Sequence, residues 1–161
     1  GYRDYLRLGS ESDVLLVSYG RLSEQVYMAR ENLRSEQIKA DMLKLTCLSP
    51  LPSSVLEICK QYSQVLFYEE GIKNGGIGQQ LLLMLHEQGF QGEFHLRAIE
   101  NFVAQSTVNE ALADLKLDAA SMVSDVKMLL FDENDKKRCE EIGGKNTAGC
   151  CGDRKRIGGK P

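Results

Sequence analysis

The 161-residue sequence lacks several features that would assign it to a particular class of protein. No apolar run approaches the ~18 residues of a membrane span, so no membrane partner is expected. The first four residues, Gly-Tyr-Arg-Asp, show no signal-peptide pattern. The net charge is −3 and no basic stripe dominates, which argues against nucleic-acid binding. The missing initiator Met predicts a processed chain or a piece of a longer protein.

Residues that catalysis would need are scarce. His86 and His95 are the only histidines, and no Ser or Cys stands in a nucleophile-elbow context. No catalytic residue is therefore expected in this chain. The five cysteines are an odd number, and Cys47 and Cys59 lie inside apolar segments. This pattern predicts reduced thiols and a cytoplasmic location.

A metal site is not expected either. Cys139, Cys150 and Cys151 include no C-x2-C pair, and both histidines lie far away in the sequence. Structural zinc sites require more regular ligand spacing than this.

Strand-like and helix-like segments alternate along the chain. Short apolar runs predict strands at residues 13–18, 38–45, 65–68 and 94–98. Apolar residues at helical spacing predict helices over residues 22–33, 54–62, 77–85 and 107–115, and after residue 118. Such alternation builds right-handed βαβ units. We therefore expect an α/β fold, a three-layer α/β/α sandwich with a mostly parallel sheet of about five strands.

Local signals predict where these elements begin and end. Ser54 with Glu57, and Thr107 with Glu110, are spaced as capping boxes that open helices. The pair Glu69-Glu70 is expected to end the third strand. The fourth strand is more polar, which predicts a place nearer the sheet edge.

The chain is predicted to have two parts. Residues 1–126 form the α/β body, and residues 127–161 form a helical extension with a Gly/Lys-rich tail. The second part holds nine Lys and Arg against six Asp and Glu, whereas the first holds eleven against seventeen. From about Asp135 the composition predicts disorder or weak attachment.

A glycine-rich turn follows the third strand, and it supplies the candidate site residues. These are Glu69, Glu70, Gly75, Gly76 and Gly78. The turn matches neither the dinucleotide fingerprint, which needs a third glycine, nor a P-loop, which needs Gly-Lys-Ser/Thr. Either it allows tight helix–sheet packing, or its amides form an anion or subunit-contact site.

The two glutamates are not expected to act as an acid/base pair. Neighbouring side chains in a strand point to opposite faces. One of them is instead expected to bond the amides of the following turn, or a partner chain.

Several segments together resemble one family, the transketolase C-terminal domain. They are Val17-Ser18-Tyr19-Gly20, the stretch 42–51 with its Pro-Leu turn, and the stretch 65–78. Within that superfamily, the spacing Glu-Glu-x4-Gly-Gly-x-Gly and the segment 115–119 are most similar to 1-deoxy-D-xylulose-5-phosphate synthases. The resemblance covers residues 12–126, and residues 99–106 depart from it because the His and Gly usual in those synthases are absent.

The resemblance implies a role in a larger enzyme. That enzyme would condense pyruvate with glyceraldehyde 3-phosphate for isoprenoid synthesis, using thiamin diphosphate and magnesium bound by two preceding domains. This chain would support dimerisation, contact those domains and catalyse nothing alone. Alternatives are the same domain of a transketolase or a pyruvate dehydrogenase β-subunit, or a stand-alone anion- or nucleotide-binding module using the turn at residues 75–78.

Overall fold

The computed structural model describes residues 3–100 and 107–143, with only the backbone course for 132–143. The strands are β1 (Tyr5–Leu8), β2 (Val14–Tyr19), β3 (Asp41–Leu45), β4 (Gln64–Ile72) and β5 (Glu93–Ile99). The helices are α1 (Leu22–Ser35), α2 (Ser53–Cys59), α3 (Ile77–Glu87), α4 (Val108–Asp114) and α5 (Ala119–Gly143). The chain divides into two units, residues 1–126 and 127–161.

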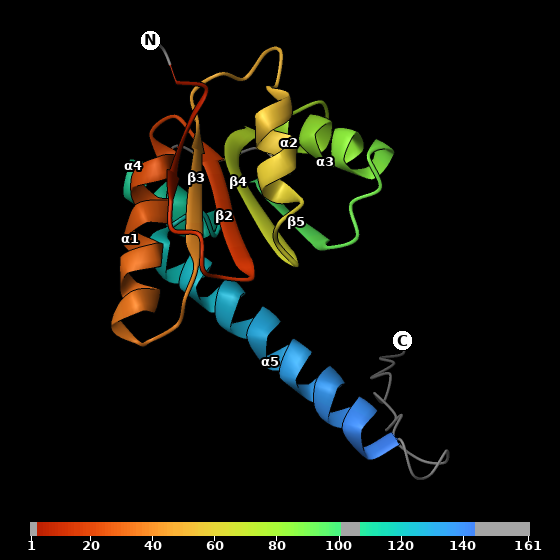
Figure 1. Ribbon diagram of the computed structural model, residues 1–161. Coiled ribbons are helices and arrows are strands. Elements are labelled where there is room, and N and C mark those ends of the chain that lie inside the picture. The colour runs from red at the N-terminus through yellow and green to blue at the C-terminus, as the bar shows by residue number, and fades with distance from the viewer. Residues whose placement is uncertain (1–2, 101–106, 144–161) are drawn as a thin grey trace, which may run out of the picture. The chain divides into compact units, whose positions relative to one another are not determined.

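The five strands form one mostly parallel sheet in the order β1-β3-β2-β4-β5. β2 pairs in parallel with both β3 and β4, and β5 pairs in parallel with β4. Only β1 runs antiparallel, with Tyr5 opposite Leu45. Helices α2 and α3 lie on one side of the sheet and α1 on the other (Figure 1). The expected three-layer α/β sandwich is thus confirmed, and so is the edge position of the polar fourth predicted strand, β5.

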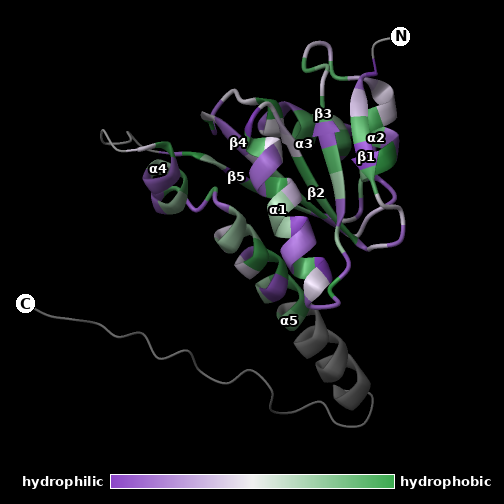
Figure 2. Ribbon diagram, turned by 90° about the vertical axis from the view of Figure 1, so that its left-hand side faces the viewer, coloured by the Kyte–Doolittle hydropathy of each residue, from purple (hydrophilic) through white to green (hydrophobic). Residues whose placement is uncertain are grey.

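The central strand β2 is buried on both faces, as a parallel strand between two helical layers must be. Leu15 and Val17 pack in one core cluster with α2 and α3 residues such as Leu56 and Leu81. Helix α1 buries Val26 and its apolar neighbours and leaves polar residues outside. Figure 2 shows this difference: β2 is hydrophobic, whereas hydrophilic and hydrophobic residues alternate along α1.

A polar cluster ties the first turns of α5 to β4 and β5. Asp125 receives two hydrogen bonds from Arg97, Nε at 3.0 Å and Nη2 at 2.7 Å. The Tyr68 hydroxyl donates to the same carboxylate at 3.4 Å. Tyr68 is fully buried, so its hydroxyl depends on this acceptor. Burial and the Asp125 charge raise the pKa of Tyr68.

One of the two predicted capping boxes was wrong. Helix α2 begins at Ser53 with Pro52 as its N-cap, and no side chain caps it. Ser54 therefore lies inside the helix, and Glu57 pairs with Lys60 instead. Because Pro52 already holds the extended conformation that an N-cap needs, the helix starts one residue before the predicted capping serine. The second capping box, at Thr107 and Glu110, is confirmed.

The strand boundaries also differ in two places. β4 continues past Glu69 and Glu70 to Ile72, with a register shift against β5 between Tyr68 and Ile72. Such irregularities let a strand run on while it re-aims its side chains. Strand β1 was not predicted, because four residues are too few to show a clear alternation.

The last described helix is longer than the sequence pattern indicated. Helix α5 starts as expected after Asp118 and runs to Gly143, so residues 135–143 are helical where disorder or weak attachment was predicted. The rest of the predicted tail, residues 144–161, lies outside the described residues. In the part of the chain that is described, no helix has the length and apolarity needed to cross a membrane.

Asp125→Ala should lower the free energy of unfolding by about 1–3 kcal/mol, because it leaves the buried Tyr68 hydroxyl without its acceptor. The measurement is urea unfolding followed by circular dichroism. Asp114→Ala, an exposed position on α4, is the matched control and should change little. Equal stability of the two variants would show that the cluster does not hold α5.

Candidate functional site at the β4–α3 turn

The candidate site lies where the strand order reverses. From β2 the chain passes to β3 on one side, and from β3 it crosses back to β4 on the other. In open α/β sheets, the carboxyl ends of the strands at such a point are the usual place for ligands. Here those ends carry Tyr19 at the end of β2, and Glu69 and Glu70 in β4.

Glu69 is buried, at 1% exposed, and its carboxylate caps helix α3 from the strand. Its Oε2 atom accepts hydrogen bonds from the amides of Ile77 at 3.1 Å and Gly78 at 3.4 Å. The Tyr19 hydroxyl donates to the same oxygen at 3.2 Å. The N-cap residue Gly76 has no side chain, so Glu69 accepts hydrogen bonds from the first amides of the helix in its place.

Glu70 points to the opposite face, as the strand alternation requires. Its two carboxylate oxygens both lie 2.9 Å from Nε of Arg21, the N-cap residue of α1. The adjacent glutamates thus serve different helices, Glu69 at the start of α3 and Glu70 at the start of α1. The sequence identified both acids, but it gave no sign that Tyr19 and Arg21 would be their partners.

The glycines of the turn are required by backbone geometry and by close packing. Gly75 has φ +81°, a left-handed conformation that favours glycine. A Cβ on Gly76 would meet Glu69 Oε1 and would lie 2.7 Å from the Ile72 carbonyl oxygen. A Cβ on Gly78 would meet Leu96 and would lie 2.9 Å from Phe67 Cδ1. The turn therefore brings the α3 backbone against both Glu69 and the sheet.

One oxygen of Glu69 has an unusual environment. Within the described residues, Oε1 is buried without a hydrogen-bond partner. It lies close to the backbone of Gly76 and Gly78: a side chain on Gly76 would collide with it, and a Cβ on Gly78 would lie 3.3 Å from it. All protein donors to this carboxylate therefore converge on the other oxygen.

The surroundings of Tyr19 change the pKa of its hydroxyl. Burial, and after it the Glu69 carboxylate, raise the pKa of Tyr19 from 10.0 to about 12. The phenol therefore stays protonated, and keeps donating to Glu69, at pH values where an unfolded tyrosine would ionise.

The two histidines lie apart from this turn in the chain. His86 is exposed on α3, and His95 on β5 lies 2.9 Å through Nε2 from Gln64 Oε1. Over residues 3–100 and 107–131, no group of three His, Cys, Asp or Glu side chains is placed to hold a metal ion. Cys150 and Cys151 lie outside the described residues, and the side chain of Cys139 is not described.

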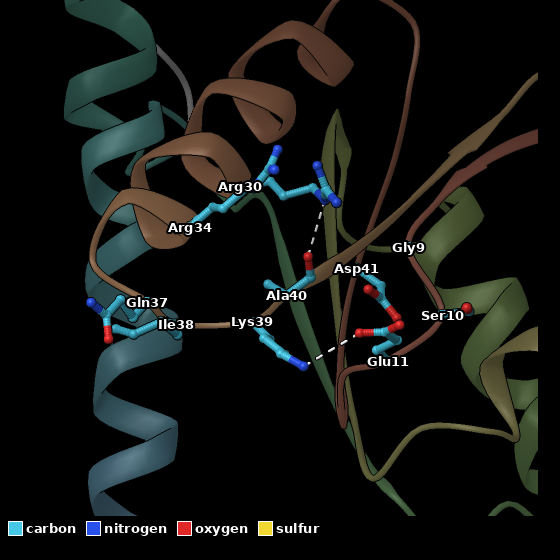
Figure 3. Close-up of a pocket in the computed structure, with 10 residues that line it drawn as sticks. All are labelled: Gly9, Ser10, Glu11, Arg30, Arg34, Gln37, Ile38, Lys39, Ala40 and Asp41. Carbon is cyan, nitrogen blue, oxygen red and sulfur yellow. Dashed lines mark hydrogen bonds and ion pairs between the residues drawn. The ribbon is translucent and has the colours of Figure 1, made fainter.

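A surface cavity of about 550 Å³ lies at the amino ends of β2 and β3, away from the turn (Figure 3). Its cationic side chains, Arg30, Arg34 and Lys39, each have an acidic partner: Glu31 for the arginines and Glu11 for the lysine. The C-terminal end of α1 adds partial negative charge there. These features do not favour an anionic ligand in this cavity.

Gly76→Ala should lower the free energy of unfolding by about 1–3 kcal/mol, because the methyl group overlaps a backbone carbonyl that has little freedom to move. Thermal unfolding measures the loss. Asn74→Ala, exposed in the same turn, is the control and should stay close to wild type. A Gly76→Ala variant as stable as Asn74→Ala would mean that the turn is not closely packed.

Stability should fall as the pH rises between about 10 and 12, because over that range the folded chain keeps the Tyr19 proton that the unfolded chain loses. Tyr19→Phe should make this decline shallower, although it removes a hydrogen bond worth about 1 kcal/mol at neutral pH. Urea unfolding at stepwise pH values measures the slope. Tyr27→Phe, 47% exposed on α1, is the control and should keep the wild-type slope; identical slopes for all three proteins would contradict the prediction.

Comparison with known proteins supports the resemblance seen in the sequence. The family described as "Transketolase, C-terminal domain" matches residues 4–123. A 1-deoxy-D-xylulose-5-phosphate synthase of Lachnoclostridium phytofermentans is 30% identical over 122 residues, which cover 74% of this chain and 20% of that protein. The synthase of Leifsonia xyli is 29% identical over 124 residues, covering 76% of this chain and 19% of that protein. The chain thus spans about a fifth of the length of these relatives.

Solved structures agree at the level of the fold. A split-gene transketolase, described as an inactive β4 tetramer, superposes with a TM-score of 0.69 at 21% identity, over 79% of this chain and 43% of that one. Transketolase of Pichia stipitis gives 0.56 at 14% identity, over 81% of this chain and 18% of that one. The matched family, the synthase relatives and the shared fold lead to one assignment: the chain belongs to the transketolase C-terminal domain family.

Proposed function

We propose that this chain is the structural and dimerisation domain of a thiamin-diphosphate-dependent 1-deoxy-D-xylulose-5-phosphate synthase. The parent enzyme would condense pyruvate with glyceraldehyde 3-phosphate in isoprenoid-precursor synthesis, as a homodimer in the cytoplasm. The names of the relatives support the parent activity, and the chain matches about a fifth of their length. On its own the chain would catalyse nothing.

The observation that carries the docking role is the outward face of α3. Between Gly76 and His86 this segment contains no charged Asp, Glu, Lys or Arg. Leu82 and Leu83 are nevertheless 38% and 57% exposed, and Ile72, directly before the turn, is 70% exposed. By contrast, α1 carries several charged residues on its outer side. Uncharged helices with exposed leucines are typical of surfaces that another protein covers.

The turn residues fit the same role. Glu69, Glu70, Gly75, Gly76 and Gly78 set the path of the chain between Ile72 and the start of α3. We assign them to shaping a surface that contacts the preceding domains or a second copy. The alternative, a stand-alone anion-binding module, is less favoured because the carboxylate of Glu69 already takes the amides of Ile77 and Gly78.

We assign thiamin diphosphate and magnesium to the preceding domains of the parent. This chain lacks the Gly-Asp-Gly motif with a following Asn that holds the diphosphate and metal in the family, and Gly152-Asp153-Arg154 is not that motif. Alternative parents that the sequence resemblance allows are a transketolase, two of whose structures share the fold, and a pyruvate dehydrogenase β-subunit.

The test is sedimentation of the purified chain, with and without phosphate or thiamin diphosphate. The proposal expects a dimer that neither ligand changes. Leu83→Lys should weaken dimerisation by about tenfold or more, because a buried lysine without a partner costs at least 1–2 kcal/mol at an interface.

Met28→Lys, 47% exposed on α1, is the matched control and should leave the dimer unchanged. A dimer that tolerates Leu83→Lys as well as Met28→Lys would move the interface elsewhere. A monomer that binds thiamin diphosphate tightly would overturn the proposal.

A further inference from the structure

The β4–α3 turn is built like an anion site, but it carries its own anion. Helix α3 is 11 residues long, and its first amides, those of Ile77 and Gly78, point at one carboxylate oxygen of Glu69. Helix N-termini favour negative charge, because the amides and the helix dipole both act on it. In this turn the anion comes from the preceding strand.

We propose that Glu69 is a positioning residue: its carboxylate acts as an internal anion that sets the shape of the turn used in assembly. The assembly part of this inference rests on the proposed function. The internal-anion part stands on the geometry alone.

The donors around Glu69 indicate that its charge matters. Oε2 receives three hydrogen bonds, from two amides and the Tyr19 hydroxyl. The nearby cation, Arg21, is bound to Glu70 instead. A buried carboxylate is stable only when such donors replace water. A neutral side chain would leave the same donors with a weaker acceptor.

The packing indicates that no external anion shares the site. Oε1 lies against Gly76 and Gly78, where even a methyl group would collide with surrounding atoms. The carboxylate therefore fills the space between β4 and the first turn of α3. Inorganic phosphate, which is larger than a carboxylate, should find no room in the wild-type turn.

The same contact connects Glu69 to the exposed surface. Between Glu69 and Ile77 the chain passes through Lys73, Asn74 and Gly75, which are all exposed. Because Glu69 holds the helix end of this segment, its removal should free the turn without opening the core around Leu81.

The experiment compares Glu69→Ala and Glu69→Gln with wild type, in the presence of sodium formate or sodium chloride at equal ionic strength. Formate is a carboxylate small enough for the space that the shortened side chain leaves. Glu69→Ala should lower the Tm by roughly 10 °C, and formate should restore part of that loss in a saturable manner. Glu69→Gln, which keeps the shape but loses the charge, should also lower the Tm.

Two controls separate this effect from general salt stabilisation. Wild type should respond equally to formate and chloride. Glu57→Gln removes an exposed carboxylate that pairs with Lys60, and its Tm should change little and show no formate effect. If Glu69→Ala does not fold alone, formate-dependent recovery of its circular dichroism signal gives the same answer.

Three results would overturn the inference. Glu69→Gln as stable as wild type would show that charge is not needed. Glu69→Ala that responds alike to formate and chloride would show that no anion site exists there. A saturable phosphate effect on wild type that Gly76→Ala removes would show an open anion site.

Sedimentation of the same proteins tests the assembly part separately. The dimer dissociation constant should rise for Glu69→Ala and fall again with formate. A wild-type monomer would refute the proposed dimerisation, while the formate dependence of the Tm would still decide whether Glu69 is an internal anion.

Discussion

The carboxylate of Glu69 is the constraint on which this end of the molecule depends. A buried carboxylate needs donors in place of water, and here they come from the first amides of α3 and from the Tyr19 hydroxyl. The contact joins the ends of β2 and β4 to the start of α3. The same contact explains why positions 76 and 78 are glycines, because any side chain there would overlap the carboxylate or the sheet.

Glu69 and Glu70 are adjacent in β4 but contact helices on opposite sides of the sheet. Glu70 points away from α3 and pairs with Arg21 at the start of α1. At the edge where many α/β proteins hold a ligand, this chain thus places one buried carboxylate, Glu69, and one partly exposed carboxylate, Glu70, each with partners of its own. Glu69 is buried at this edge, whereas the segment of α3 from Ile77 to His86 contains no Asp, Glu, Lys or Arg and carries exposed leucines. This combination is that of a domain shaped for contact with other protein surfaces.

Much of the fold could be predicted, because its signals are local and repeated. Buried parallel strands appear as apolar runs, and the helices between them show apolar residues at helical spacing. The capping box at Thr107 and Glu110 needed only its own four residues. The same pattern at Ser54 failed because Pro52 already starts the helix. Strand β1 was missed because its four residues depend on pairing with β3, which lies far along the chain.

For the candidate site, the sequence alone determined the residue types: an acidic pair on opposite faces of a strand, then glycines that permit a tight turn before a helix. It also carried the motifs of the family to which the chain belongs. The expectation that one acid bonds the amides of the following turn matches the contacts of Glu69 with Ile77 and Gly78. Only the tertiary structure decided that Tyr19 and Arg21 are the other donors, because they reach the acids across the sheet from about fifty residues away. Long-range contacts depend on strand order and register, and no local pattern encodes either of them.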